Sequence, residues 1–290
     1  MSRLPRFSIL SPLAEIPPPL QEDKQAMSPE TRILPASTVL LLRDGPQGLE
    51  VFMVVRHHQI DFAAGAMVFP GGKVHADDAR TEVRRRCDGV EGLDDSGLAF
   101  RVAAIREAFE ECGVLLARPD GAQRLVTAAE AAPLERDRRR LEQGEMAIAD
   151  FLDRARLRLA CDLLVPFAHW ITPAVMPKRF DTHFFVAAAP ADQAAAHDGG
   201  ESVDSVWVRP EDALAAAQRG DRTIIFPTKL NLMKLAESRS VDDVFDRARR
   251  TRIVTVLPEL DTSSGTPRLR IPADAGYAIT EATLEDVRGR

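Results

Sequence analysis

Three glutamates near the middle of the chain have the types and spacing that could support metal-dependent chemistry. Glu107, Glu110 and Glu111 are spaced i, i+3 and i+4, so a helix would place their carboxylates side by side. Like charges this close destabilise a bare helix, and a cation would turn that cost into a binding site. Because all the ligands are oxygen atoms, the pattern predicts a site for Mg²⁺ or Mn²⁺. A solvated acidic helix face is the alternative interpretation.

The helix that must position these carboxylates can be predicted from the neighbouring residues. Apolar residues recur at i, i+4, i+7 and i+11, namely Leu98, Val102, Ile105 and Phe109. This spacing predicts a stripe that faces the core, roughly opposite the glutamates. We predict that the helix begins near Asp95, after residues that favour N-caps, and that Gly113 ends it in a left-handed C-cap. Arg106 stands four residues before Glu110 and could fix the orientation of that carboxylate.

A glycine turn upstream completes a known pattern. Phe69-Pro70-Gly71-Gly72-Lys73 would let the backbone approach a metal site closely. Together with the glutamate helix it resembles the Nudix box, which reads glycine, five residues, acid, seven residues, then Arg-Glu-apolar-any-Glu-Glu-any-Gly-apolar. Gly72 matches the first glycine, and residues 106–114 match the whole second half.

The first half of the pattern departs from the family. Asp78 stands where the family usually has glutamate, and 27 residues, not seven, separate it from Arg106. We predict that residues 79–94 form an inserted surface loop. A split box of this kind is similar to the branch of Nudix hydrolases that includes a peroxisomal coenzyme A diphosphatase. The departure leaves the role of Asp78 open.

The resemblance implies a fold, an activity and a set of site residues. The implied fold is an α/β/α sandwich around a mixed β-sheet, and the implied reaction is metal-dependent hydrolysis of a nucleoside diphosphate derivative. Glu107 and Glu111 are the expected metal ligands, with Glu110 and the Gly72 backbone as further candidates. Arg106 is expected to orient a glutamate at the catalytic centre. Glu201, outside the box, is our candidate for the general base, with an exposed loop acid as the alternative.

Two segments bear on the substrate. Arg56, followed by Gly65 and Phe69-Pro70-Gly71-Gly72, resembles a coenzyme A signature, although Asp61 stands where that signature has arginine. Lys178 and Arg179 open a segment that looks like one shared with the coenzyme A-cleaving branch, and they could bind a 3′-phosphate or the diphosphate.

The substrate hypotheses follow from these segments. The leading one is coenzyme A or an acyl-coenzyme A, cleaved to 3′,5′-ADP and a phosphopantetheine product. Alternatives are ADP-ribose, NADH or a nucleotide sugar. A catalytically silent, nucleotide-sensing Nudix domain is an alternative of another class, and the intact glutamates count against it.

Composition excludes several classes of function. The chain has 290 residues, is 45% hydrophobic and 28% charged, and carries a net charge of −6, which argues against nucleic-acid and anionic-membrane partners. The three cysteines lack Cys-x-x-Cys spacing, which predicts reduced thiols in a cytoplasmic protein and no zinc site built on them. His57, His58 and His169 are predicted to be solvated or structural. The expected partner is a small-molecule nucleotide, and a homodimer is left open.

The remaining pattern predicts the element order and the domain limits. Strands are predicted at 37–43, 49–56, 66–69, 163–172, 180–189 and 203–209. Helices are predicted at 128–160, 210–219, 227–238 and 241–250. We predict a loosely ordered Pro-rich leader over 1–34, a Nudix domain over 35–255 with a helical insertion at 115–160, and a C-terminal tail over 256–290.

Overall fold

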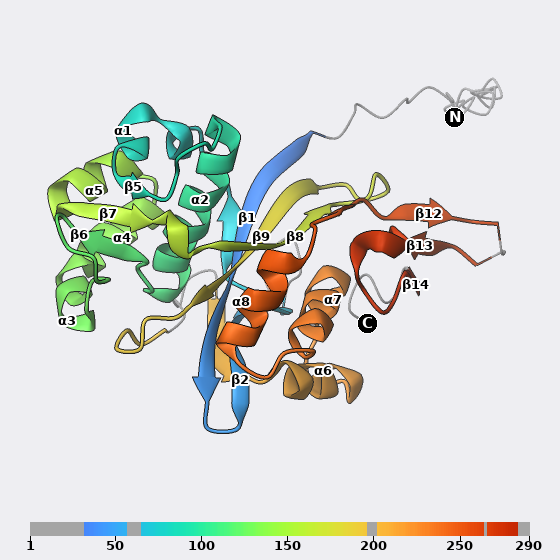
Figure 1. Cartoon of the computed structure of the whole chain (residues 1–290). Helices are drawn as coiled ribbons and strands as arrows, with labels where there is room; N and C mark the ends of the chain where they lie inside the picture. Colours follow the sequence, from blue (N-terminus) through green and yellow to red (C-terminus); the bar gives the residue numbers. More distant parts are fainter. Residues whose placement is uncertain (1–31, 57–64, 196–201, 264–265, 284–290) are drawn as a thin grey trace, which may run out of the picture. The chain divides into compact units, whose positions relative to one another are not determined.

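The structure, a computed structural model, describes residues 32–56, 65–195, 202–263 and 266–283. A mixed sheet forms its centre, with the strand order β10-β2-β1-β9-β8-β11 and with β3 and β4 paired to β2 and β1 (Figure 1). The strands are β1 (Ile33–Gly45), β2 (Gly48–Arg56), β3 (Met67–Val68), β4 (Gly71–Lys73), β8 (Val165–Ile171), β9 (Arg179–Ala188), β10 (Ser202–Val208) and β11 (Thr255–Val256). β1 pairs with β9 and β8 with β11 in parallel, and the other pairs are antiparallel.

The central strand β1 is buried on both faces, because its apolar run feeds two hydrophobic cores. Val39 and Leu41 pack in one core, and Leu40 and Leu42 pack in the other. The first core contains residues of α2 (Asp95–Cys112), α4 (Glu135–Glu142) and α5 (Ile148–Ala155). The second contains residues of α6 (Pro210–Gln218), α7 (Phe226–Leu235) and α8 (Val241–Arg250). The predicted α/β/α sandwich around a mixed sheet is therefore confirmed (Figure 1).

Helix α2 begins and ends where the sequence predicts. The Asp94 side chain caps the N-terminus by accepting a hydrogen bond from the Gly97 N–H at 2.7 Å, and Gly113 closes the C-terminus with a φ of 69°. All four residues of the predicted stripe are buried. The three glutamates are also at least nine-tenths buried, so α2 is enclosed nearly all round.

The prediction of a surface loop over residues 79–94 is wrong. This segment contains α1 (Thr81–Arg84) and β5 (Cys87–Asp88), and Val83 is fully buried. β5 pairs in parallel with β7 (Leu157–Ala160), which also pairs with β6 (Ala117–Pro119). The two insertions therefore fold together around a small three-stranded sheet. Elements this short show no periodicity from which the sequence could predict them.

Two other segments are more divided than predicted. The helical stretch 128–160 consists of α3 (Ala128–Ala131), a 3₁₀ turn, α4 and α5, and then strand β7. Residues 259–283 form a third sheet of β12 (Glu259–Asp261), β13 (Arg268–Arg270) and β14 (Glu281–Thr283). No helix within the described ranges has both the length and the apolar character that crossing a membrane requires. The predicted leader lies almost wholly outside those ranges.

Candidate active site

Arg106 of α2 lies at the centre of a buried group of carboxylates. Its Nε and Nη2 donate to the two oxygens of Asp78, each at 3.1 Å, and its Nη1 donates to Glu107 at 2.8 Å and to Glu110 at 2.9 Å. Nη2 also donates to the Lys73 carbonyl at 2.8 Å, so all five N–H groups have acceptors. Burial opposes the charge of Arg106, but the carboxylates outweigh burial and raise its pKa. The geometry fits the predicted orienting role.

The glutamates of α2 face the glycine turn at close range. The Gly71 N–H donates to Oε2 of Glu111 at 2.9 Å. A Cβ on Gly72 would lie 2.6 Å from the Glu107 carboxyl atoms, and a Cβ on Gly71 would lie 2.4 Å from the Ser37 carbonyl oxygen. Only glycine fits at either position without displacing its neighbours. The turn and the helix thus meet as the sequence predicts.

Asp78, whose role the sequence left open, joins this group despite the long separation. Its side chain is fully buried and accepts both hydrogen bonds from Arg106. Its Oδ2 also accepts from the His75 N–H at 2.8 Å, at the start of the 3₁₀ helix Ala76–Ala79. The five-residue spacing from Gly72 was the signal for this position. Although 27 residues separate Asp78 from Arg106 in the sequence, the two side chains are in direct contact.

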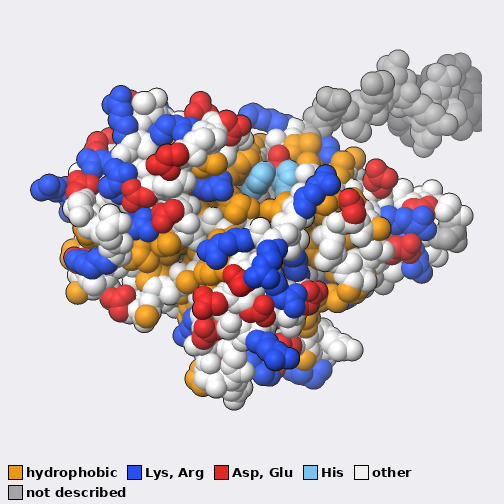
Figure 2. Space-filling view, viewed as in Figure 1, with side chains coloured by type: hydrophobic (Ala, Val, Ile, Leu, Met, Phe, Trp, Pro, Cys, Tyr) orange, Lys and Arg blue, Asp and Glu red, His pale blue; other side chains and the backbone are white. Residues whose placement is uncertain are grey.

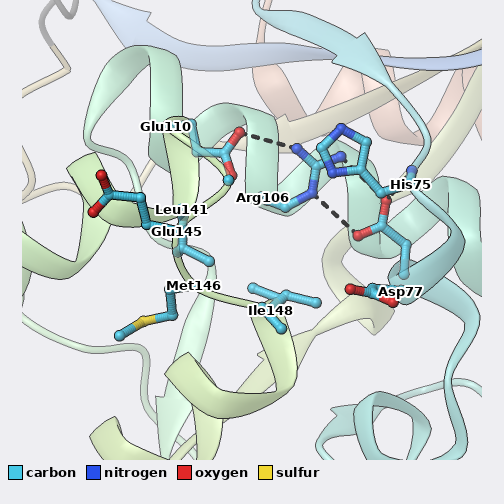
Figure 3. A pocket seen from close by; sticks show the side chains of 11 residues that line it. His75, Asp77, Arg106, Glu110, Leu141, Glu145, Met146 and Ile148 are labelled. Carbon is cyan, nitrogen blue, oxygen red and sulfur yellow. Dashed lines mark hydrogen bonds and ion pairs between the residues drawn. The ribbon is translucent and has the colours of Figure 1, made fainter.

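A pocket of about 250 Å³ opens beside Arg106 and Glu110. Figure 3 shows His75 and Asp77 on one side of it and Leu141, Met146 and Ile148 on the other. The second group belongs to α4, α5 and the loop between them, so the helical insertion forms a wall of the site. Glu107 and Glu111 do not line this pocket, because they face the glycine turn.

The same insertion also contacts α2 through Arg138 of α4. Its Nη1 donates to the Glu110 backbone carbonyl at 2.6 Å, in the last turn of α2, where helical carbonyls lack partners. The Arg138 guanidinium is held in turn by both carboxylate oxygens of Glu135. Sequence reasoning missed this residue, because nothing in a run of surface-like charges distinguishes one arginine from its neighbours.

The cluster formed by Asp78, Glu107, Glu110 and Glu111 has features of a divalent-cation site. Three buried carboxylates share the Arg106 guanidinium, the buried Glu111 carboxylate lies on the same helix, and Glu110 Oε1 is a buried oxygen without a hydrogen-bond partner. Such an oxygen is costly unless a cation or proton satisfies it. An all-oxygen set of this kind fits Mg²⁺ or Mn²⁺.

The predicted substrate residues come from strands on opposite sides of β1. Arg56 ends β2, and Arg179 begins β9, where its Nε donates to the Thr172 carbonyl at 2.9 Å. The Lys178 ammonium lies 5.9 Å from the centre of the Phe180 ring. Glu201, the candidate base, lies outside the described residues, as do Asp61, His57 and His58.

The pKa of Glu110 leads to a testable pH dependence. Burial raises this pKa from the ordinary 4.5 to about 7, although Arg106 opposes the shift. Between these two pKa values the folded protein therefore holds a proton on Glu110 that the unfolded chain releases, so the contribution of Glu110 to stability is fully present below about pH 4.5 and is lost as the pH rises through 7. Glu110 therefore gives the free energy of unfolding a slope against pH of up to about 1.4 kcal/mol per pH unit. In metal-free protein we expect Glu110→Gln to remove this slope.

Urea denaturation between pH 5 and 8 measures this difference as the free energy of unfolding of each protein. Glu82→Gln, on an exposed side chain of α1, is the matched control and should follow the wild type. Parallel curves for wild type and Glu110→Gln would contradict a raised pKa at this site.

Comparison with known proteins places this geometry in a family. The model of the NUDT19 Nudix domain matches residues 84–235, which include α2 and begin after the glycine turn. Two proteins called acyl-coenzyme A diphosphatase NUDT19 are similar to the chain: that of Xenopus laevis, 26% identical over 57% of this chain, and that of Gallus gallus, 26% identical over 69%. The chain spans 54% and 64% of their lengths.

A solved structure agrees in fold. The NUDIX hydrolase from Alicyclobacillus acidocaldarius has a TM-score of 0.62 and 29% identity, covering 76% of this chain and 97% of its own. Because the family model matches more than half of the chain, and includes the helix that carries Arg106 and the three glutamates, the chain belongs to the Nudix hydrolase family.

Proposed function

We propose that this chain hydrolyses the diphosphate bond of a nucleoside diphosphate derivative, with coenzyme A or an acyl-coenzyme A as the leading substrate. The products would be 3′,5′-ADP and a phosphopantetheine compound. The observation that carries the proposal is the meeting of Glu107 and Glu111 with the Gly71-Gly72 backbone, together with the unpartnered oxygen of Glu110 on the same helix. A diphosphate is strongly anionic, so its cleavage requires the positive charge that this site is built to hold.

Glu107 and Glu111, with Glu110 and the Gly72 carbonyl as further ligands, would hold Mg²⁺ or Mn²⁺. The bound ion supplies charge neutralisation at the phosphates and an activated water. The protein's own contribution is orientation. Arg106 fixes two of the carboxylates, and the Gly71 N–H fixes the third. Asp78 balances the charge of Arg106, so that this guanidinium is held in place rather than released to the substrate.

Support for a coenzyme A substrate comes from the relatives and from β9. The similar frog and chicken proteins carry the name acyl-coenzyme A diphosphatase. In the sheet, Gly72 pairs with Ser37, Ser37 pairs with His183, and Arg179 lies four residues before His183 on β9. Arg179 is therefore displaced along β9 by about 13 Å from the level of the glycine turn. An extended nucleotide that carries a 3′-phosphate as well as a diphosphate could span the separation between the glycine turn and Arg179.

A substrate panel tests the proposed function. Coenzyme A, an acyl-coenzyme A, ADP-ribose, NADH and a nucleotide sugar are each incubated with Mg²⁺ or Mn²⁺, and the products are resolved by chromatography. We expect coenzyme A or its acyl form to be cleaved fastest, and cleavage to stop when a chelator is added. Faster cleavage of ADP-ribose would transfer the assignment to that class. Nucleotide binding without any turnover would favour a sensing domain.

The 3′-phosphate of coenzyme A gives a sharper prediction. If Lys178 and Arg179 bind it, dephospho-coenzyme A should have a kcat/KM about ten- to a hundredfold lower, since a charge-assisted phosphate contact contributes roughly 1.5–3 kcal/mol. Arg179→Ala should erase most of that preference and leave the metal requirement unchanged. Arg219→Ala, on the exposed end of α6, is the control and should keep the preference. If wild-type protein cleaved coenzyme A and dephospho-coenzyme A at equal rates, Lys178 and Arg179 would have no role in binding the 3′-phosphate.

A further inference from the structure

A single row of paired residues crosses the sheet away from the glycine turn. Gly72 of β4 lies opposite Ser37, Ser37 opposite His183, His183 opposite His169, and His169 opposite Thr255 of β11. Neighbouring strands are about 4.8 Å apart. The two histidines therefore lie about 10 and 14 Å from Gly72, close to the carboxylate site but separate from it.

Three potential metal ligands meet in this row. His169 and His183 are directly opposed on antiparallel strands, which brings their side chains close. Asp181 precedes His183 by two residues on β9, so it projects from the same face. His169 Nε2 lies 2.5 Å from Asp181 Oδ1, and His183 Nε2 lies 3.9 Å from the same oxygen. One donor atom from each residue lies within 4.8 Å of the others.

The surroundings hold these side chains and leave them partly accessible. The Phe100 ring of α2 stacks on His183 with centroids 3.9 Å apart, and the two imidazole rings lie 4.1 Å apart. The Thr255 hydroxyl is 2.8 Å from His169 Nδ1, which directs Nε2 of that ring toward Asp181. The side chains of Asp181 and His183 are each 34% exposed. Figure 2 shows histidine side chains at a hollow on this face of the molecule.

We propose that His169, Asp181 and His183 bind one Zn²⁺ ion, at a second metal site distinct from the α2 carboxylates. Two nitrogen donors and one oxygen suit Zn²⁺, whereas Mg²⁺ prefers oxygen alone. Bond lengths of about 2.0–2.2 Å place tetrahedral ligand atoms about 3.3–3.6 Å apart, so each donor moves by less than about 1 Å to bind. The fourth tetrahedral position would be left to water or to an anionic oxygen.

A hydrogen bond within the cluster favours the ligating orientation of His169. Thr255 supplies the hydrogen bond to the second ring nitrogen that metal-bound histidines generally make. The alternative is a metal-free chain of hydrogen bonds from Thr255 through His169 to Asp181, which would need no role for His183.

Cobalt and zinc binding to the full chain separates these alternatives. Protein carrying Glu107→Gln and Glu111→Gln is titrated with Co²⁺ in excess Mg²⁺, and visible absorption is recorded, followed by displacement with Zn²⁺ in a calorimeter. We expect one tight site per chain, with intense d–d bands typical of tetrahedral Co²⁺ and no thiolate charge-transfer band. Because this background lacks the two main proposed ligands of the α2 site, and excess Mg²⁺ competes for what remains of it, the result does not depend on the proposed hydrolase activity.

Variants assign the site to its residues. His169→Ala and His183→Ala should each weaken Zn²⁺ binding by about a hundredfold or more, and Thr255→Val should weaken it by about ten- to a hundredfold. His75→Ala, at the pocket beside Arg106, is the matched control and should bind as the parent does. Circular dichroism is used to check that each variant is folded. If an alanine variant does not fold, the Zn²⁺ affinity of Thr255→Val tests the site instead. Unchanged affinity in the folded variants, or a parent without tetrahedral Co²⁺ bands, would overturn the site.

Discussion

Replacing Glu111 with glutamine is expected to lower kcat by a hundredfold or more while the protein stays folded. The two side chains have nearly the same shape, so the hydrogen bond that the Gly71 N–H donates at 2.9 Å can be kept by the amide oxygen. What is lost is a negative ligand facing the glycine turn. A single metal ligand supplies several kcal/mol of charge stabilisation in the transition state, and a hundredfold corresponds to about 2.7 kcal/mol.

The measurement is steady-state turnover of the best substrate of the panel at saturating Mg²⁺, with thermal unfolding followed by circular dichroism. Glu82→Gln removes the same charge from an exposed position on α1 and should leave kcat within a few-fold of wild type. A Glu111→Gln enzyme that also stays within a few-fold would show that α2 is not the metal-binding element.

Arg106→Met is expected to destabilise the protein by about 3–5 kcal/mol. The substitution keeps much of the buried side-chain volume and removes the one guanidinium that faces Asp78, Glu107 and Glu110. Breaking a buried ion pair costs this much because the remaining carboxylates are left buried without a counter-charge. The loss should be smaller at pH 5, where buried carboxylates can take up protons instead.

Two further variants test whether the loss comes from the buried network. Arg106→Lys keeps the charge but has three donors in place of five, so it should recover part of the stability and less of the activity. Arg84→Met breaks the partly exposed pair with Asp95, at 3.0 Å, and should cost no more than about 1 kcal/mol. Urea denaturation of metal-free protein gives each free energy of unfolding. A loss for Arg106→Met no larger than that for Arg84→Met would contradict the network described here.

The sequence predicted the bounds of α2 well because the determinants of this helix are local. The apolar stripe from Leu98 to Phe109, the cap at Asp94 and the left-handed Gly113 all act within one or two turns. The spacing of the glutamates follows from the same helix. The sequence also predicted the longer strands, because each is long enough to show its apolar pattern; these are β1, β2, β8, β9 and β10.

The parts that the sequence missed or left open depend on contacts between distant segments. Asp78 and Arg138 each lie 28 residues from the partner they contact on α2. The pairing of β5 with β7, and the opposition of His169 and His183, depend on strand register. Register is set by the whole sheet and has no signature in either strand alone. His169, predicted to be structural or solvated, is therefore recognised as a candidate ligand only once its neighbours are known.

The contact between Arg138 and the last turn of α2 has a consequence for how the molecule folds. Helix α2 can begin to form from local interactions, but Arg106 meets Asp78, and the Glu110 backbone carbonyl meets Arg138, only after two loops of nearly thirty residues have closed. Contacts of this range are made late, after the entropy of loop closure has been overcome. Substitutions at Arg106 and Arg138 should then act mainly by accelerating unfolding and leave the refolding rate almost unchanged. The catalytic centre would be the last part of this domain to assemble and the first to come apart.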